Sequence, residues 1–234
     1  MARSGLVQYR TQGNVVLERM KGQPVPASVK PALATFSKMH AAYAKASNAV
    51  DSARAARDTA MALLSRDDAA LDDSIETLAE RSVGAGLGSR TQPLAAFTRH
   101  SVTRLRNLAY KSEADEVLAM TGKIAKAGVP KNVAAASAKC AKLAKTVLAD
   151  LATLVKPQAA YDKALAQRDA LLPEWTRAYA RLKLVAAAAW ADDKATYAAV
   201  FAAPSDIQAP KPRRTSKKKV DRSPSASASP ASPI

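Results

Sequence analysis

The spacing of hydrophobic and polar residues predicts long helices over most of the chain. The first such segment carries an apolar stripe with a seven-residue repeat over residues 36–64. Pro31 suits the first turn of a helix, and neither glycine nor proline follows it before Gly84. We therefore expect a long helix that begins at Pro31. It either continues to about Ser82 or is interrupted near Ser65, where a capping-box pattern begins.

A glycine-rich loop is expected next, at residues 84–88 and running on to Pro93. Its Gly-x-Gly-x-Gly pattern lacks the preceding strand and the Gly-Lys-Ser/Thr ending of phosphate-binding loops. A second helix is expected from Pro93 or Leu94 to about Ala127. If the loop reverses the chain, the basic first half of this helix lies antiparallel to the acidic residues 67–80, and the two segments neutralise each other.

Residues 117–149 carry six lysines and no acidic residue. Within this stretch, residues 126–132 combine glycine, proline and asparagine, which predicts a turn between two helices. A third helix is expected over about 132–155. The result is a helical hairpin with a positive tip that no acid nearby in the sequence neutralises. Its lysines are Lys123, Lys126, Lys131, Lys139, Lys142 and Lys145.

The last long helix is expected over about 157–191. It would begin at Pro157, because the Val-Lys-Pro sequence that ends there repeats the Val-Lys-Pro at the start of the first helix. The heptad phase of its large apolar residues continues across Pro173, so we expect a kink there rather than a reversal. Asp192 or Asp193 then caps a further short helix.

Residues 1–30 allow two interpretations. Two short apolar runs, at 6–9 and 15–17, flank a polar Thr-Gln-Gly-Asn segment and fit a small hairpin of strands. Alternatively, Asn14 caps a short helix that ends at Met20. The Gly-Gln-Pro-Val-Pro sequence that follows breaks regular structure in either case, so this region is expected to be an arm on a stiff linker.

From Pro204 onward the chain is rich in proline, serine, alanine and basic residues. Such a composition cannot bury enough apolar surface to fold, so residues 204–234 are expected to be a disordered tail. Basic blocks of this kind are typical of patches that bind nucleic acids, bind acidic surfaces or direct nuclear import. The cations of the tail that we expect to bind a polyanion are Lys211, Arg213, Arg214, Lys217, Lys218 and Lys219.

The expected fold class is all-α: an antiparallel bundle of about four long, alanine-rich helices with a disordered basic C-terminal tail. The expected domains are an N-terminal arm and linker (1–30), a helical bundle (31–203) and the tail (204–234). Aromatic residues make up only 5% of the chain. Those at helical spacing on apolar faces are expected to anchor the core rather than to stack on nucleic-acid bases.

The sequence contains no recognisable catalytic constellation, metal-binding motif or cofactor motif. His40 and His100 fall on different expected helices, and each is expected to be a surface or boundary side chain. Four carboxylates within residues 67–80 share one helix face. A single straight helix cannot surround a metal ion, so we expect a solvated or salt-bridged surface there. Cys140 falls on an apolar face and is expected to be a buried thiol.

The formal net charge of +16 favours polyanionic partners, although charge of this size also serves solubility. We expect a non-enzymatic interaction or scaffolding protein whose lysine hairpin and tail bind DNA, RNA or an acidic protein without sequence preference. An alternative is a homo-oligomer that coats a surface, with the tail as a solubilising segment. A third possibility, an enzyme or ligand carrier, requires a pocket with converging polar groups. Neither a signal peptide nor a membrane-spanning run is found, so a cytoplasmic location is expected.

Overall fold

A computed structural model describes residues 3–202, and in that range it contains only α-helices and loops. The helices are α1 (Arg3–Lys21), α2 (Lys30–Gly84), α3 (Val102–Arg106), α4 (Tyr110–Lys126), α5 (Lys131–Ala189) and α6 (Lys194–Phe201). The expectation of an all-α fold is confirmed for these residues. The tail at 204–234 lies outside the described residues, so its expected disorder stays a prediction.

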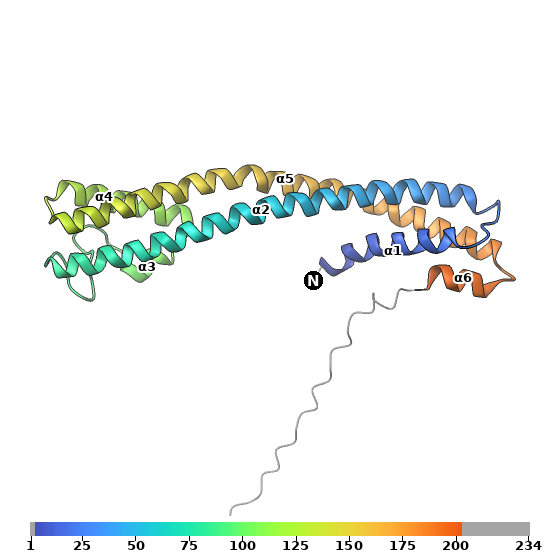
Figure 1. The fold of residues 1–234 in the computed structure, drawn as a ribbon, viewed down its shortest axis with the longest axis horizontal. Helices are drawn as coiled ribbons and strands as arrows, with labels where there is room; N and C mark the ends of the chain where they lie inside the picture. Colours follow the sequence, from blue (N-terminus) through green and yellow to red (C-terminus); the bar gives the residue numbers. More distant parts are fainter. Residues whose placement is uncertain (1–2, 203–234) are drawn as a thin grey trace, which may run out of the picture.

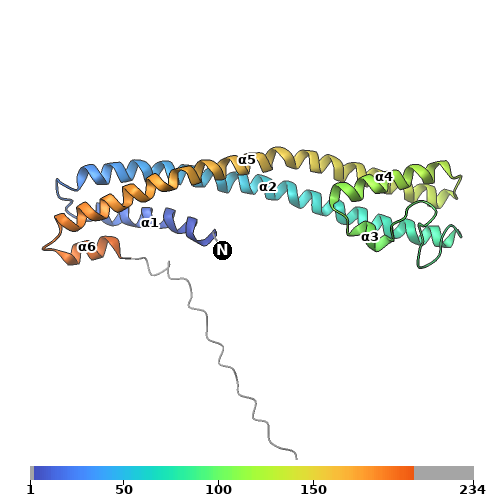
Figure 2. The same ribbon diagram turned by 180° about the vertical axis from the view of Figure 1, so that it is seen from behind.

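Two long helices, α2 and α5, run antiparallel and form a rod (Figure 1). α2 has 55 residues, which corresponds to a length of about 80 Å at about 1.5 Å per residue. α1 and α6 lie at one end of the rod, called here the α1 end, and α3 and α4 lie at the other, the α4 end (Figures 1 and 2). Within the described range, two long helices and four shorter ones therefore replace the expected four long helices.

α2 is a single uninterrupted helix, so the continuous alternative was the right one near Ser65. The seven-residue stripe faces the interior of the rod. Its fully buried members are Phe36, Tyr43, Val50 and Leu64. Arg57 lies in the same stripe and is half-buried, because its guanidinium stacks over the ring of Tyr161, 4.3 Å from the ring centroid. α2 thus offers α5 an almost continuous apolar edge.

The expected helix boundary at Pro157 is wrong, because α5 continues through both Pro157 and Pro173. A proline inside a helix removes one backbone hydrogen bond and costs about 3 kcal/mol. α2 and α5 pack against each other along their length, and buried side chains of α5 flank each proline. Val147, Tyr161 and Trp175 are all buried in this way. This packing along the length of α5 offsets the free-energy cost of the two prolines. The expectation that Pro173 does not reverse the chain is confirmed.

The helix expected over 93–127 is wrong in its first part, where residues 85–101 form a loop before α3 and α4. α2 ends in a glycine turn in which Gly86 adopts a left-handed φ of 73°. The loop is irregular but packed, because Leu94 and Phe97 insert into the hydrophobic core at the α4 end. Burial of these two side chains stabilises an irregular backbone path that helical propensity alone does not predict.

Residues 1–30 contain the helix α1, so the interpretation as a hairpin of strands is wrong. α1 also runs through Asn14 instead of starting there. Its Val16 and Met20 are buried against the rod, which makes α1 a docked element. The two-residue repeat of a strand and the 3.6-residue repeat of a helix are hard to distinguish in apolar runs this short.

The cap expected for the short helix after α5 is confirmed. The side chain of Asp193 accepts a hydrogen bond from the backbone N–H of Thr196 at 3.0 Å, at the start of α6. A carboxylate at this position satisfies one of the unpaired N–H groups of the first helical turn and lies at the positive end of the helix dipole. That interaction lowers the pKa of Asp193.

Hydrophobic side chains gather in two clusters, one at each end of the rod. The cluster at the α4 end combines α2, the 85–101 loop, α4 and the first half of α5. The cluster at the α1 end is rich in aromatic residues and combines α1, α2, α5 and α6. Between them, a small buried group consists of Val50, Tyr161 and Ala164. The aromatic residues therefore anchor the core, as expected.

Candidate functional site

The α4–α5 hairpin has the turn that the sequence predicts. α4 ends at Lys126, Gly128 adopts a φ of 63°, and α5 begins at Lys131 directly after Pro130. A left-handed residue after a helix favours glycine, which has no Cβ to clash. The turn brings the end of α4 beside the start of α5, so lysines from both helices share one end of the rod (Figure 1).

All six lysines of this hairpin are exposed. We call them the lysine tip, which consists of Lys123, Lys126, Lys131, Lys139, Lys142 and Lys145. The four on α5 lie within about 120° of one another around the helix axis, at roughly 100° per residue. The opposite face of α5 packs into the core with Val133, Cys140 and Val147. These core contacts orient the lysines toward solvent.

No ion pair joins the lysine tip to a carboxylate within residues 3–202. Lys123 donates a hydrogen bond from Nζ to the carbonyl oxygen of Phe97 at 3.0 Å, which neutralises no charge. An exposed cation without a carboxylate partner adds directly to the local positive potential. In the part of the chain that the structure describes, the lysine tip is therefore an uncompensated cationic surface.

Three arginines extend this cationic end beyond what the sequence analysis predicts. Arg90 and Arg99 are exposed in the loop before α3, and Arg104 is exposed on α3. None of them forms an ion pair within the described range. If residues 93–127 formed one helix, its arginines would lie along the acidic part of α2 and would be neutralised there. The sequence therefore does not predict these arginines as binding residues. Ser101, a good N-cap residue inside that expected helix, was the available signal for a later helix start.

The expected neutralisation of the acidic residues 67–80 by the basic segment takes place through α3. Arg106 forms ion pairs with Asp72, at 3.2 Å, and with Glu76. These carboxylates raise the pKa of Arg106. Among the described residues, no group of three or more histidine, cysteine, aspartate or glutamate side chains is placed to hold a metal ion. The acidic residues thus form a partly salt-bridged surface.

One carboxyl group is buried beside this ion pair. Glu113 of α4 is only 1% exposed. Burial, and then the negative charges of Asp72 and Asp68, raise the pKa of Glu113 to about 8. The side chain is therefore protonated and neutral at pH 7, which suits its position between α4 and α2. The sequence pattern does not predict this burial, because it depends on how α4 packs against α5 beside the carboxylates of α2.

His40 is buried at the α1 end, where it bonds to Asn14 and Trp175, so the expectation of a surface or boundary side chain is wrong for this residue. His100 is half-buried at the α4 end, as expected. Gly13 was the available signal, because a glycine inside a helix often marks a close approach of another group.

Cys140 is buried as expected, with its Sγ atom 3.2 Å from the hydroxyl oxygen of Ser74. Burial raises the pKa of the Cys140 thiol. Since the thiolate is the nucleophile, a thiol with a raised pKa in an apolar core is chemically inert at neutral pH. This cysteine contributes packing.

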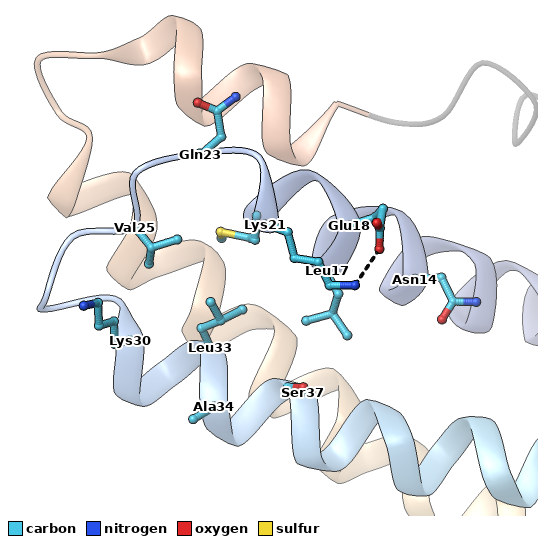
Figure 3. A pocket seen from close by; sticks show the side chains of 11 residues that line it. Asn14, Leu17, Glu18, Lys21, Gln23, Val25, Lys30, Leu33, Ala34 and Ser37 are labelled. Atoms are coloured by element: carbon cyan, nitrogen blue, oxygen red, sulfur yellow. Dashed lines mark hydrogen bonds and ion pairs between the residues drawn. The ribbon is translucent and has the colours of Figure 1, made fainter.

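A groove of about 890 Å³ lies between α1, the 22–29 linker and the start of α2 (Figure 3). Its floor is apolar and includes Leu17, Val25 and Leu33. Its one carboxylate, Glu18, is 2.9 Å from the ammonium group of Lys21. The lining contains no histidine or cysteine.

The cations expected in the tail lie outside the described residues. They are Lys211, Arg213, Arg214, Lys217, Lys218 and Lys219. Their expected role in binding stays a prediction that rests on composition. What the structure adds is the position of α6, whose last residue, Phe201, lies at the α1 end (Figures 1 and 2).

The described fold is an elongated antiparallel helical hairpin with a cationic surface at the α4 end. A fold of this class does not by itself specify a function. No helix in residues 3–202 is both long and apolar enough to cross a membrane. A comparison of the chain with protein-family models, curated proteins and solved structures finds no significant match.

Proposed function

We propose that this protein is a non-enzymatic helical scaffold that binds nucleic acid through its phosphate backbone, at the lysine tip and the basic tail. The observation that carries the proposal is the set of six exposed lysines at one end of the rod, without a carboxylate partner in the described residues. The cytoplasm is the compartment that we assign to this activity.

The spacing of the lysines on α5 suits a polyphosphate. From Lys131 to Lys145 the helix rises about 21 Å, and duplex DNA carries roughly one charge per 1.7 Å of its axis. Several phosphates therefore lie within reach of one helix face. The N-terminus of α5 adds the positive end of a helix dipole at the same tip. Arg90, Arg99 and Arg104 supply further cations at this end.

The absence of exposed aromatic groups near the tip favours phosphate contacts over base contacts. At the α4 end, Phe97 is buried and Tyr110 is half-buried. Binding of single strands usually uses aromatic side chains on which bases stack. Contacts to phosphates fix position but read no sequence. We therefore expect binding without sequence preference, and duplex DNA or RNA as the preferred form.

The position of α6 gives the scaffold a second point of attachment. The tail follows α6, which is at the α1 end, whereas the lysine tip is at the α4 end. If the tail and the lysine tip both bind, one molecule would contact two polyanions, or two sites on one. Multivalent attachment of this kind raises the overall affinity when the geometry allows both contacts.

The proposal is tested by reversing charge at the tip and, separately, elsewhere. The tip variant carries Lys131→Glu, Lys139→Glu, Lys142→Glu and Lys145→Glu. The matched control reverses four exposed lysines of the long helices away from the tip: Lys38→Glu, Lys45→Glu, Lys156→Glu and Lys163→Glu. Both variants have the same net charge. Affinity for a short DNA duplex is measured by fluorescence anisotropy at several salt concentrations.

For the unchanged chain, contact with about six phosphates gives a slope near −5 in a plot of log affinity against log salt. The tip variant is expected to reduce the slope to about −2 and to lower the affinity at least about 100-fold at low salt. The control is expected to keep most of the slope. Equal losses in the two variants would mean that overall charge, and not this surface, holds the nucleic acid. Deleting residues 204–234 is expected to flatten the slope without loss of helix.

Self-association is the second candidate function, favoured by apolar side chains on the outer faces of the long helices. Val155 is 67% exposed and Leu184 is 73% exposed, both on α5, and Leu63 of α2 is 42% exposed. Such positions can pack against a second copy of the rod. Light scattering at low and high salt, after nuclease treatment, separates the two candidates. A defined oligomer that persists without nucleic acid supports self-association.

A further inference from the structure

α1 is connected to both long helices through one imidazole. The indole N–H of Trp175, on α5, donates a hydrogen bond to Nδ1 of His40, on α2, at 3.1 Å. Nε2 of His40 lies 2.8 Å from Oδ1 of Asn14, on α1. His40 is 3% exposed and Trp175 is fully buried. These three side chains form a relay that spans three helices.

The donors and acceptors of the relay fix the protonation state of His40. An indole N–H can only donate, so Nδ1 of His40 must be the acceptor and carries no proton. The proton of the neutral ring is therefore on Nε2, which donates to Asn14. Protonation of the ring would place a second N–H on Nδ1, directly opposite the indole N–H. The relay is thus compatible only with the neutral imidazole.

The backbone of α1 approaches the same ring closely. Gly13 is buried, and a Cβ atom at this position would lie 2.1 Å from Nδ1 of His40. That distance is far below any van der Waals contact, so α1 docks in this register because residue 13 has no side chain. The backbone of α1 therefore packs directly against the ring of His40.

The surroundings of His40 provide no negative charge to compensate an imidazolium. Phe36 stacks on the ring, with the centroids 5.8 Å apart. Burial lowers the pKa of His40. The titratable side chains around the cluster are phenols, namely Tyr9 on α1, Tyr43 on α2, Tyr179 on α5 and Tyr197 on α6. The carboxylates on the elements around His40 are Glu18 on α1, Asp51 on α2, and Asp169 and Glu174 on α5. Glu18 pairs with Lys21 at 2.9 Å, Asp51 with Arg10 at 3.0 Å and Asp169 with Arg168 at 2.7 Å, and the side chain of Glu174 is exposed.

The other contacts of α1 are the buried side chains of Val16 and Met20, the ring of Tyr9 and hydrogen bonds at the surface. The groove of about 890 Å³ separates part of α1 from the start of α2 (Figure 3). Gln12 donates to the hydroxyl oxygen of Tyr179 at 3.0 Å. Arg19 donates to the carbonyl oxygen of Ala202 at 2.6 Å, which ties α1 to the end of α6. A short terminal helix that joins the rest of the fold on one side can open separately from the long helices.

We propose that the His40 relay is an acid-sensitive latch, in which protonation of His40 releases α1 from α2 and α5. The proton comes from solvent and binds Nδ1, and the hydrogen bond from Trp175 is lost. Because Arg19 of α1 caps the end of α6, release of α1 also frees α6 from that contact. The aromatic surface that α1 covers, which includes Phe36 and Trp175, then becomes accessible.

The direction of the pH response follows from proton linkage. The docked state binds the proton less tightly than the undocked state, in which the imidazole has its ordinary pKa near 6.5. Docking of α1 is therefore fully favoured above that pH and is lost as the pH falls below it. The ratio of undocked to docked molecules rises up to about tenfold for each pH unit in this window.

The test uses the full chain with Trp190→Phe, in which Trp175 is the only tryptophan. Acrylamide quenching of Trp175 fluorescence is measured from about pH 8 to about pH 5, with circular dichroism as the measure of helix content. We expect the quenching constant to rise several-fold as the pH falls through about 6.5, while α2 and α5 keep most of the helical signal. Quenching that stays constant over this range overturns the proposal.

Three further substitutions in this background separate the latch from a general acid effect. His40→Gln keeps an amide acceptor and an amide donor but cannot titrate, so it should abolish the pH response. His100→Gln, at the other end of the rod, should leave the response intact. Gly13→Ala should give high quenching at every pH. A response that survives in His40→Gln contradicts the proposal.

If α1 is undocked at every pH in the His40→Gln variant, the test is made on the chain that retains His40. Its imidazole resonances are titrated by nuclear magnetic resonance, with His100→Gln used to assign them. The latch requires that the midpoint of the His40 titration coincide with the midpoint of the change in Trp175 quenching. Two midpoints that differ by more than about one pH unit overturn it.

Discussion

Replacing Trp175 with alanine is expected to lower the free energy of unfolding by about 3–5 kcal/mol. The side chain is fully buried and lies at the centre of the aromatic cluster at the α1 end. Its ring contacts those of Tyr9 and Tyr179, each with a centroid distance of 5.2 Å, and that of Phe36 at 5.5 Å. The substitution removes these contacts and leaves Nδ1 of His40 buried without a donor. Urea unfolding followed by circular dichroism measures the loss.

Trp175→Phe and Trp190→Ala provide the controls for this prediction. Trp175→Phe retains a ring but removes the N–H, so its cost should be smaller, about 1–3 kcal/mol. Trp190 is 7% exposed and lies at the C-terminal end of α5, away from the centre of the cluster. Its replacement by alanine should cost less than that of Trp175. A loss below about 1 kcal/mol for Trp175→Ala would show that the cluster collapses around the cavity or does not hold the α1 end.

Replacing Glu113 with glutamine is expected to stabilise the protein by up to about 5 kcal/mol near pH 8.5, with little effect near pH 4.5. Glutamine has the shape of the protonated glutamic acid and cannot ionise between α4 and α2. In the unchanged protein, the pKa of Glu113 is raised from its ordinary 4.5 to about 8 in the folded state. The stability that this group contributes is full below pH 4.5 and declines as the pH rises toward 8. The substitution removes that decline.

The measurement is thermal unfolding at a series of pH values for the unchanged chain and for Glu113→Gln. Asp115→Asn is the matched control, because Asp115 is on the same helix, is half-exposed and pairs with Lys111. Its effect should be within about 0.5 kcal/mol at every pH. If Glu113→Gln is no more stable than the unchanged chain at alkaline pH, Glu113 is ionised and solvated in the native state, contrary to its burial.

The sequence is sufficient to predict the start of α2, the α4–α5 turn and the cap of α6, but it leaves the continuity of α2 near Ser65 open. These features depend on local rules: a seven-residue stripe, a left-handed glycine at position 128 and a carboxylate at position 193. The uninterrupted α5 is not predicted in this way. Local rules end a helix at Pro157, whereas contacts with α2 continue it. Tertiary packing also decides the path of residues 85–101, where Leu94 and Phe97 are buried.

The lysine tip is predictable because exposure of lysines on the polar face of a helix follows from periodicity. The other groups of interest are not. His40 and Trp175 are 135 positions apart in the sequence, and their hydrogen bond depends on the register between α2 and α5. Glu113 is polar and would be assigned to the surface by composition alone. In both cases the burial and the contacts of the side chain depend on which helices pack together, and a single sequence does not specify this.

The two ends of the rod differ in how far apart their components are along the chain. The cluster at the α4 end is built from residues between Met61 and Leu154, a contiguous segment. The cluster at the α1 end joins residues near Tyr9 with residues near Phe201. During synthesis on a ribosome, the α4 end can therefore close while the chain is still being made. The α1 end must wait for α6 to emerge, so the aromatic faces of α1 and α2 are the surfaces that a nascent chain leaves open longest.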